Sequence, residues 1–217
     1  MPLKEKITKF FKSLSFEKVK NTVLVIYFLL LLSAVYHSLY ARKIIPGVKV
    51  GAVRVGGKTY SEALNLLEEY EKDVEKELKL SYEGKDFWIR ADEIGLTYDW
   101  DSSVSRAFEV GRTGYILRDT KEKLVGLLKT LYIGAFYDYD DEALGVKFSI
   151  IKGEINKEAS QSGVMLDGDN LTVTSADRGL KVEDSGLYSI VIKSFDRLDF
   201  SDKLIPTKVV NPIILEE

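Results

Sequence analysis

The stretch AVRVGGKT, residues 52–59, has the residue types of a nucleotide-binding loop. It satisfies the permissive form of the phosphate-loop signature, in which backbone N–H groups wrap the phosphates and a lysine reaches them. A working loop needs small residues, whereas Val53, Arg54 and Val55 occupy its positions, and β-branched residues favour extended backbone. The stretch therefore predicts a strand, a turn at Gly56-Gly57 and a helix cap at Thr59, and we expect no nucleotide partner.

Groups for nucleophilic catalysis and metal binding are scarce. The chain has no cysteine and one histidine, His37, which lies in an apolar segment. This composition excludes disulfides, a cysteine nucleophile and thiolate metal sites, and it leaves histidine-based triads and zinc sites without support. The acidic run 138–142 lacks the spacing of a calcium-binding loop and indicates a helix start. We expect a non-enzyme without catalytic residues, metal or cofactor, although 34 acidic residues leave a two-carboxylate glycosidase open.

Aromatic side chains and one arginine are the strongest binding candidates. Aromatic faces stack on sugar rings, and an arginine pairs with the carboxylates of peptides. The predicted ligand-binding residues are Tyr98, Trp100, Arg112, Tyr115, Tyr137 and Tyr139. A second interpretation of Arg112, which stands between two glycines, is that it satisfies carbonyl groups at a helix end. Trp88, in a hairpin, is a further candidate for stacking, but both it and Phe108, on a helix, are expected in the core.

Residues 22–41 contain no charged side chain and match the length of a membrane-spanning helix. The first 20 residues hold six lysines and two glutamates, a net charge of +4, whereas the remainder holds 25 basic and 32 acidic residues, a net charge of −7. This asymmetry places the N-terminus in the cytoplasm and the body outside, and the acidic body argues against nucleic-acid binding. A cleaved signal peptide is the alternative, but no small-x-small cleavage site follows the segment.

The remaining sequence predicts an α+β fold, with an N-terminal transmembrane helix followed by one domain of β-hairpins and about four to five amphipathic helices. We expect strands at 48–55 and 204–210, hairpins at 78–91 and 163–176, a helix after Asp99 or Asp101, and helices at about 60–77, 119–132, 140–151 and 185–197. The apolar stripe of the helix at 119–132 is formed by Leu124, Leu127, Leu128 and Leu131. The predicted domains are a basic cytoplasmic tail (1–21), a transmembrane signal anchor (22–41), an α+β domain (44–210) and an exit linker (211–217).

An ordered series of short motifs resembles a known family. Pro46-Gly47 leads into a glycine-punctuated strand, and Gly57-Lys58-Thr59 with Glu62-Ala63 opens a helix. Further matches follow in order: Glu93-Ile94-Gly95-Leu96 with Tyr98-Asp99, Ala107 with Gly111-Arg112-Thr113-Gly114, Tyr139-Asp140, Arg178-Gly179-Leu180, and Ile205-Pro206 with Pro212. Over about residues 44–215 the chain resembles the peptidoglycan-binding domain found ahead of VanW-type proteins and some L,D-transpeptidases.

The resemblance implies a membrane-anchored, extracytoplasmic cell-envelope module without catalytic residues. Its partner would be peptidoglycan or a wall precursor, and an L,D-transpeptidase activity lacks its cysteine nucleophile. Two other hypotheses stay open. The module could be a scaffold for another envelope protein, or the anchor half of a wall-modifying enzyme whose catalytic domain lies elsewhere.

Overall fold

The computed structural model describes residues 16–167, 170–174 and 176–212. Its N-terminal helix α2 (Phe16–Tyr40) contains the uncharged segment of the sequence. Residues Glu17–Tyr40 are long and apolar enough to cross a membrane, and their most apolar window is not buried inside the protein. Most of the predicted basic tail (1–15), the end of the predicted exit linker (213–217) and the tip of the second predicted hairpin (168–169) lie outside the described residues.

Strands β1 (Val48–Val50) and β2 (Val53–Arg54) form a tight antiparallel hairpin over 48–55, so the predicted glycine-punctuated strand is broken at Gly51. The chain reverses at Gly51, whose φ of 52° is a conformation that glycine adopts without strain. β1 also pairs in parallel with β6 (Leu131–Ile133), which gives a three-stranded sheet in the order β2-β1-β6. The residues directly after α2 are therefore tied to a strand that lies about 80 residues later in the chain.

Helices α3 (Tyr60–Asp73) and α4 (Trp100–Glu109) pack against each other and on this sheet. Both begin at predicted caps. Thr59 and Glu62 form a capping box, and Asp99 Oδ1 accepts a hydrogen bond from the Ser102 N–H at 2.9 Å. Together with the strands they enclose the first core: Ile44, Ile45, Val48, Val50, Val55, Ala63, Leu67, Trp100, Val104, Ala107, Ala135 and Leu198.

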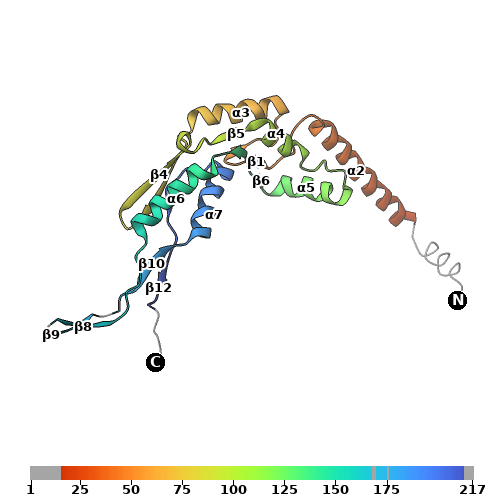
Figure 1. Cartoon of the computed structure of the whole chain (residues 1–217). Coiled ribbons are helices and arrows are strands. Elements are labelled where there is room, and N and C mark those ends of the chain that lie inside the picture. Colours follow the sequence, from red (N-terminus) through yellow and green to blue (C-terminus); the bar gives the residue numbers. More distant parts are fainter. Residues whose placement is uncertain (1–15, 168–169, 175, 213–217) are drawn as a thin grey trace, which may run out of the picture.

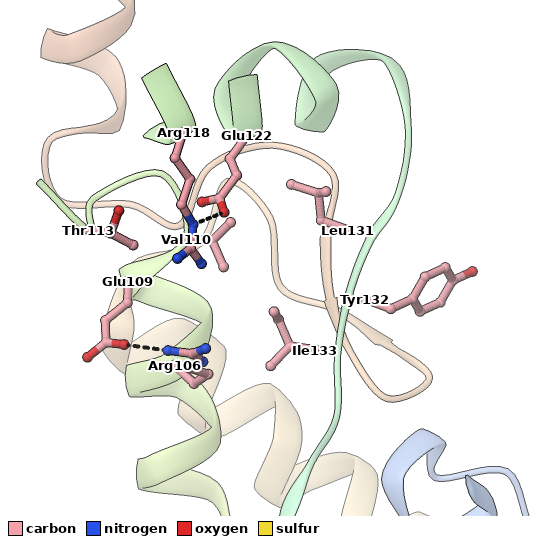
Figure 2. A pocket seen from close by; sticks show the side chains of 9 residues that line it. All are labelled: Arg106, Glu109, Val110, Thr113, Arg118, Glu122, Leu131, Tyr132 and Ile133. Atoms are coloured by element: carbon pink, nitrogen blue, oxygen red, sulfur yellow. Dashed lines mark hydrogen bonds and ion pairs between the residues drawn. The ribbon is translucent and has the colours of Figure 1, made fainter. Parts of the chain in front are cut away.

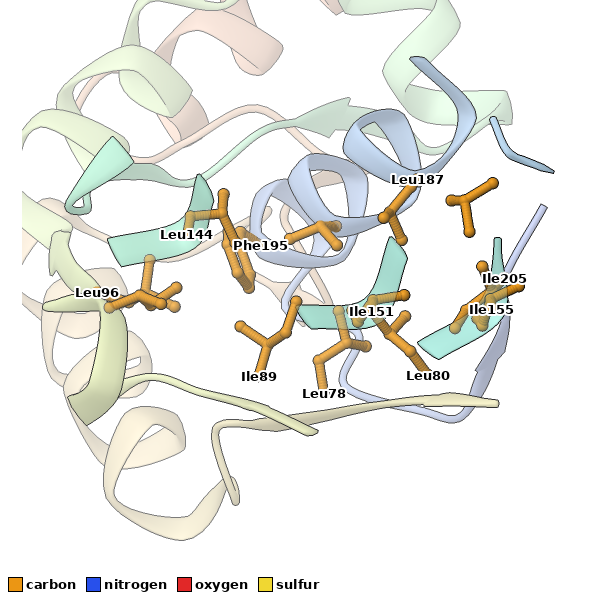
Figure 3. Close-up of a cluster of buried hydrophobic side chains, with 13 residues drawn as sticks. Leu78, Leu80, Ile89, Leu96, Leu144, Ile151, Ile155, Leu187, Phe195 and Ile205 are labelled. Carbon is orange, nitrogen blue, oxygen red and sulfur yellow. The ribbon is translucent and has the colours of Figure 1, made fainter. Parts of the chain in front are cut away.

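A second sheet holds β3 (Glu77–Tyr82), β4 (Lys85–Arg90) and β11 (Lys203–Leu204) in the order β11-β3-β4. Helices α6 (Asp141–Ile155) and α7 (Asp184–Arg197) cover one of its faces. Figure 3 shows the second core between them, with side chains from β3 and β4 facing side chains from both helices. Its buried members are Leu78, Leu80, Ile89, Ile94, Leu96, Leu144, Ile151, Ile155, Val182, Leu187, Val191, Phe195 and Ile205.

Three strand pairs complete the fold. β5 (Thr97–Asp99) pairs with β7 (Phe136–Asp138), and β10 (Gly179–Val182) pairs with β12 (Thr207–Val210). A third pair, β8 (Gly163–Asp167) with β9 (Asn170–Thr174), is the second predicted hairpin. In Figure 1, α2 leaves one end of an elongated arrangement and the β8–β9 hairpin extends from the other. The predicted α+β class is confirmed.

The helix expected over 119–132 is the largest correction. Helix α5 runs from Ile116 to Leu128, and the chain then turns into strand β6. Only Leu131 packs against a core, and it does so from β6, whereas Leu124, Leu127 and Leu128 are exposed to solvent. The leucine spacing predicted an amphipathic helix but not the direction in which its apolar face points. The expected closing strand 204–210 is likewise divided, because Ile205-Pro206 separates β11 from β12.

Candidate functional site

Four of the six predicted binding residues lie together in a ladder of aromatic rings. Tyr98 stacks on Trp100 with ring centroids 4.7 Å apart and an interplanar angle of 11°. Tyr137 meets Tyr98 edge-on at 5.8 Å, and Tyr139 follows Tyr137 at 6.0 Å. Trp100 belongs to the first core, Tyr137 and Tyr139 pack on the second, and Tyr98 contacts both. The ladder therefore joins the two cores.

The polar atoms of the ladder are already used inside the protein. The Tyr98 hydroxyl donates to the Phe195 carbonyl at 3.2 Å, and the Tyr137 hydroxyl donates to Asp196 Oδ1 at 3.0 Å. Trp100 Nε1 donates to Glu71, and only 6% of the Trp100 side-chain surface remains exposed. Burial raises the pKa of Tyr98 and of Tyr137 well above the ordinary value, so both stay neutral donors. This arrangement leaves no free indole face on which a sugar ring could stack at Trp100.

Arg112 binds carbonyl groups at helix ends, as the second interpretation of the sequence predicted. Its guanidinium donates to the carbonyl oxygens of Phe108 at 2.7 Å and Lys43 at 2.5 Å, and also to that of Tyr40. It lies 4.3 Å from the centre of the partly buried Phe108 ring, and burial lowers its pKa. Arg112 thus joins the ends of α2 and α4, and its hydrogen-bonding capacity is largely spent on this joint.

Tyr115 lies apart from the ladder, in the turn before α5, and is 73% exposed. The six predicted residues therefore do not form a common site. Their roles in ligand binding remain predictions, and the geometry gives five of them structural contacts within the chain.

Trp88 was expected in the core, and that expectation is wrong. Its side chain is 44% exposed, on the face of β4 that points away from α6 and α7. The alternation along β4 contains the signal that places it there. Phe87 and Ile89 share the inward-facing parity, so Trp88 between them must point outward. The Lys79 ammonium, on the paired residue of β3, lies 6.0 Å from the Trp88 ring centre.

A shallow hollow of about 310 Å³ lies at the free edge of strand β4, where side chains from both faces of this strand, Trp88 among them, meet side chains of helix α6. Its lining combines apolar and charged groups: Asp86, Phe87, Trp88, Arg90, Glu93, Lys147, Ile150 and Ile151. A partly exposed ring beside charged hydrogen-bonding groups offers a sugar ring a stacking face and hydroxyl partners at its edge. We call these eight residues the Trp88 hollow.

The carboxylates of the Trp88 hollow form ion pairs with nearby lysines. Hydrogen bonds from Ser81 and then Lys79 keep the pKa of Asp86 below its ordinary value. Lys147, with its ammonium 2.8 Å from Glu93 Oε2, lowers the pKa of Glu93 in the same way. The carboxylates are therefore ionised near neutral pH, when they can accept hydrogen bonds from hydroxyl groups.

A second hollow, of about 220 Å³, lies between α4, α5 and β6 (Figure 2). Its two arginines are each paired with a glutamate of their own helix, Arg106 with Glu109 at 3.2 Å and Arg118 with Glu122 at 2.8 Å. Figure 2 shows the Tyr132 ring pointing away from both arginines, so the hollow has no aromatic platform. It is a weaker candidate for a glycan than the Trp88 hollow.

Five successive backbone N–H groups of the nucleotide-loop stretch are already engaged inside the protein. The N–H groups of Val55, Gly56, Gly57 and Lys58 all donate to backbone carbonyl oxygens, at 2.9 to 3.2 Å. The N–H of Thr59 donates to Glu62 at 2.8 Å as part of the capping box. The stretch serves as a strand, a turn and a helix cap. Within the described ranges, no group of three or more acidic or histidine side chains is arranged to hold a metal ion.

One comparison with known proteins gives a match. A family model described as "Putative peptidoglycan binding domain" matches residues 88–200, which is just over half of the chain. The matched range begins at Trp88 and contains the aromatic ladder, α4 to α7 and the β8–β9 hairpin. No curated protein and no solved structure matches the chain.

Proposed function

This chain belongs to the peptidoglycan-binding domain family, and from that membership we propose that it is a membrane-anchored module that binds cell-wall glycan at the Trp88 hollow without catalysing a reaction. The observation that carries the proposal is the exposed Trp88 ring, which lies within the residues that the family model matches. Tryptophan is highly buried on average, and an exposed indole face gives a sugar ring an apolar surface on which to stack. The ligand would be peptidoglycan or one of its precursors.

Anchoring by α2 supports this function, because it would hold the domain at the surface from which the wall is reached. The lysine-rich tail before the span favours a cytoplasmic N-terminus, so the domain over 44–210 would lie outside. Residues 211–217 would then act as an exit linker. The proposal that the module is not an enzyme rests on the chain's lack of cysteine and on its single histidine, which lies within α2.

A sedimentation assay with purified cell-wall sacculi tests the binding proposal. Full-length chain in mild detergent is mixed with sacculi, and the bound fraction is measured for wild type, Trp88→Ala and Tyr132→Ala. Tyr132 is a matched control because it is also an exposed aromatic residue on a strand, but outside the Trp88 hollow. We expect Trp88→Ala to weaken binding by about 5- to 30-fold, the equivalent of roughly 1–2 kcal/mol of lost stacking.

Two results would count against the proposal. Equal sedimentation of the wild type and an unrelated acidic protein would remove the glycan partner altogether and favour the scaffold hypothesis. Equal losses in Trp88→Ala and Tyr132→Ala would leave the partner but move the site away from the Trp88 hollow.

A further inference from the structure

Helix α5 has its burial reversed relative to an ordinary surface helix. The side that faces the protein carries Asp119, Glu122, Lys123 and Gly126, which are buried or half-buried. The opposite side carries Ile116, Leu117, Leu124, Leu127 and Leu128, all of them exposed, with Leu117 at 89% and Leu128 at 85%. A helix of a water-soluble protein normally turns its apolar stripe toward the core.

Hydrogen bonds hold the polar side of α5 against the protein. Asp119 accepts hydrogen bonds from the Thr113 N–H at 2.9 Å, the Thr113 hydroxyl at 2.6 Å and the Gly114 N–H at 2.9 Å. Glu122 accepts one from the Gly111 N–H at 2.7 Å. The bonds from Thr113 and Gly114 keep the pKa of Asp119 below its ordinary range, and the pKa of Glu122 is lowered first by the bond from Arg118 and then by that from Gly111. The helix cannot rotate its leucines inward without stripping two carboxylates of their partners.

The outward apolar side is continuous. At about 100° per residue, the five apolar residues and Thr120 fall within an arc of about 120° that contains no charged residue. At the same spacing, Lys121 and Lys123 flank this arc on its two sides, whereas Arg118 lies further round the helix and pairs with Glu122. An apolar arc bordered by basic residues is the pattern of a helix that lies in the interface of an anionic membrane.

Helix α5 lies against the segment that links α2 to the domain. The chain leaves α2 at Tyr40, and Pro46 and Gly47 then approach α5 closely. A Cβ atom at Gly126 of α5 would overlap the carbonyl oxygen of Pro46, and one at Gly47 would overlap that of Gly126. The N–H of Leu131, just after α5, donates to the Gly47 carbonyl at 2.9 Å. Figure 1 shows α5 beside the end of α2 from which the chain enters the domain.

We infer that α5 lies in the outer leaflet of the membrane that α2 crosses, with its apolar side among the acyl chains and its basic residues at the lipid headgroups. The inference rests on the proposed anchoring by α2. It gives the domain a second membrane contact that would fix its tilt relative to the bilayer. The partner is a lipid surface rather than a protein, because α5 lies against Pro46 and Gly47, which follow the end of the proposed span by only six and seven residues.

Site-directed spin labelling of the full chain tests this contact, and the absence of native cysteines makes single labels possible. Cysteine replaces Leu30, Lys85, Leu124 or Leu128 in separate variants, each reconstituted in vesicles of phosphatidylethanolamine and phosphatidylglycerol. Accessibility to oxygen, which concentrates in lipid, is compared with accessibility to a water-soluble nickel chelate. A label at Leu30, within α2, gives the reference ratio for lipid. A label at Lys85, on the exposed tip of the β3–β4 hairpin, gives the reference ratio for water.

We expect the oxygen-to-nickel ratio at Leu124 and Leu128 to exceed that at Lys85 several-fold. Replacing Leu117 and Leu124 by Glu should return the Leu128 label to water and leave the Leu30 label in lipid. Leu30 in lipid with Leu124 in water would overturn the α5 contact while the anchor stands. A Leu30 label in water would remove the anchor itself and the inference with it. A Leu124 label shielded from both reagents would show a protein-covered surface and would also refute the lipid assignment.

Discussion

The guanidinium of Arg112 donates a hydrogen bond to the carbonyl oxygen of Tyr40, the last residue of α2. The last carbonyl groups of a helix lack partners within the helix, so they must be satisfied from outside. Arg112 also reaches the Phe108 carbonyl in the last turn of α4, and one side chain therefore closes the ends of two helices. This joint couples the proposed anchor to the domain.

Arg112→Ala should destabilise the domain, because it removes three hydrogen bonds made by a partly buried charged group. We expect the free energy of unfolding of the full chain in detergent to fall by about 1.5–3 kcal/mol, measured by denaturant titration. Arg54→Ala is the control, since Arg54 is exposed on β2 and its loss should cost less than about 0.5 kcal/mol. Equal effects of the two substitutions would contradict a joint at Arg112.

Substituting alanine for two helical glycines should change the stability of the protein in opposite directions. Gly126→Ala places a methyl group against the Pro46 carbonyl and should destabilise the protein by roughly 1–3 kcal/mol. Gly145→Ala, in α6, meets nothing within 4 Å and should stabilise the protein by about 0.5–1 kcal/mol through helix propensity. Thermal unfolding of both variants checks the pair, and a neutral Gly126→Ala would disprove the close approach of α5 to the linker.

The aromatic ladder should behave as a structural element. Tyr137→Phe keeps the ring but removes the donor to Asp196, so we expect a loss of roughly 1–3 kcal/mol in unfolding free energy. Tyr188→Phe is the comparison, because the Tyr188 hydroxyl pairs with Tyr139 at the surface and should matter less. If Tyr137→Phe instead left stability unchanged and abolished sedimentation with sacculi, the ladder would be a binding site after all.

Asp199 should contribute to the acid sensitivity of the fold. Bonds from Lys203 and then Ser201 lower the pKa of Asp199 from 3.8 to about 2 in the folded protein. The unfolded chain therefore binds this proton more tightly, so the contribution is present above about pH 4 and is lost as the pH falls toward 2. Because the side chain is 48% exposed, the effect should be only about 0.2–1 kcal/mol.

Unfolding free energies of wild type and Asp199→Asn, measured between pH 2 and pH 6 in roughly half-unit steps, check this slope. The Asn variant should lose part of the decline below about pH 4 and show little further change above it. Parallel curves for the two proteins would refute the role of Asp199. Asp202→Asn, at a more exposed neighbouring carboxylate, provides the matched control.

Helix starts and hairpins were predictable because their determinants are local. Thr59, Asp99 and Asp140 each accept a backbone N–H two or three residues ahead, and this geometry needs no distant partner. Glu83-Gly84, at the turn of the β3–β4 hairpin, adopts the positive φ values that a tight turn demands. The end of the helix predicted for 119–132 was missed, because Lys129 and Thr130 are not strong helix-stop residues. The helix ends there because the following residues form β6, which pairs with the distant strand β1.

The sequence named the kinds of residue in the candidate site, and the structure shows how those residues are buried and bonded. Aromatic residues and an arginine were the expected groups, yet Trp100 is buried and Arg112 is bound to carbonyl oxygens. Trp88, expected inside, is the exposed ring. The parity of Phe87 and Ile89 could have revealed it, but only after the register of the hairpin was known.

By itself the sequence determined the α+β class, the apolar helix α2, the capped helix starts and the family to which the chain belongs. Each of these depends on composition or on spacing within a few residues. Tertiary structure alone decided that the leucines of α5 point outward, that Tyr98 joins two cores, and that Arg112 ties Tyr40 to Phe108. Periodicity shows that a helix has two faces, but the partner that each face meets comes from distant segments whose packing energies no local pattern contains.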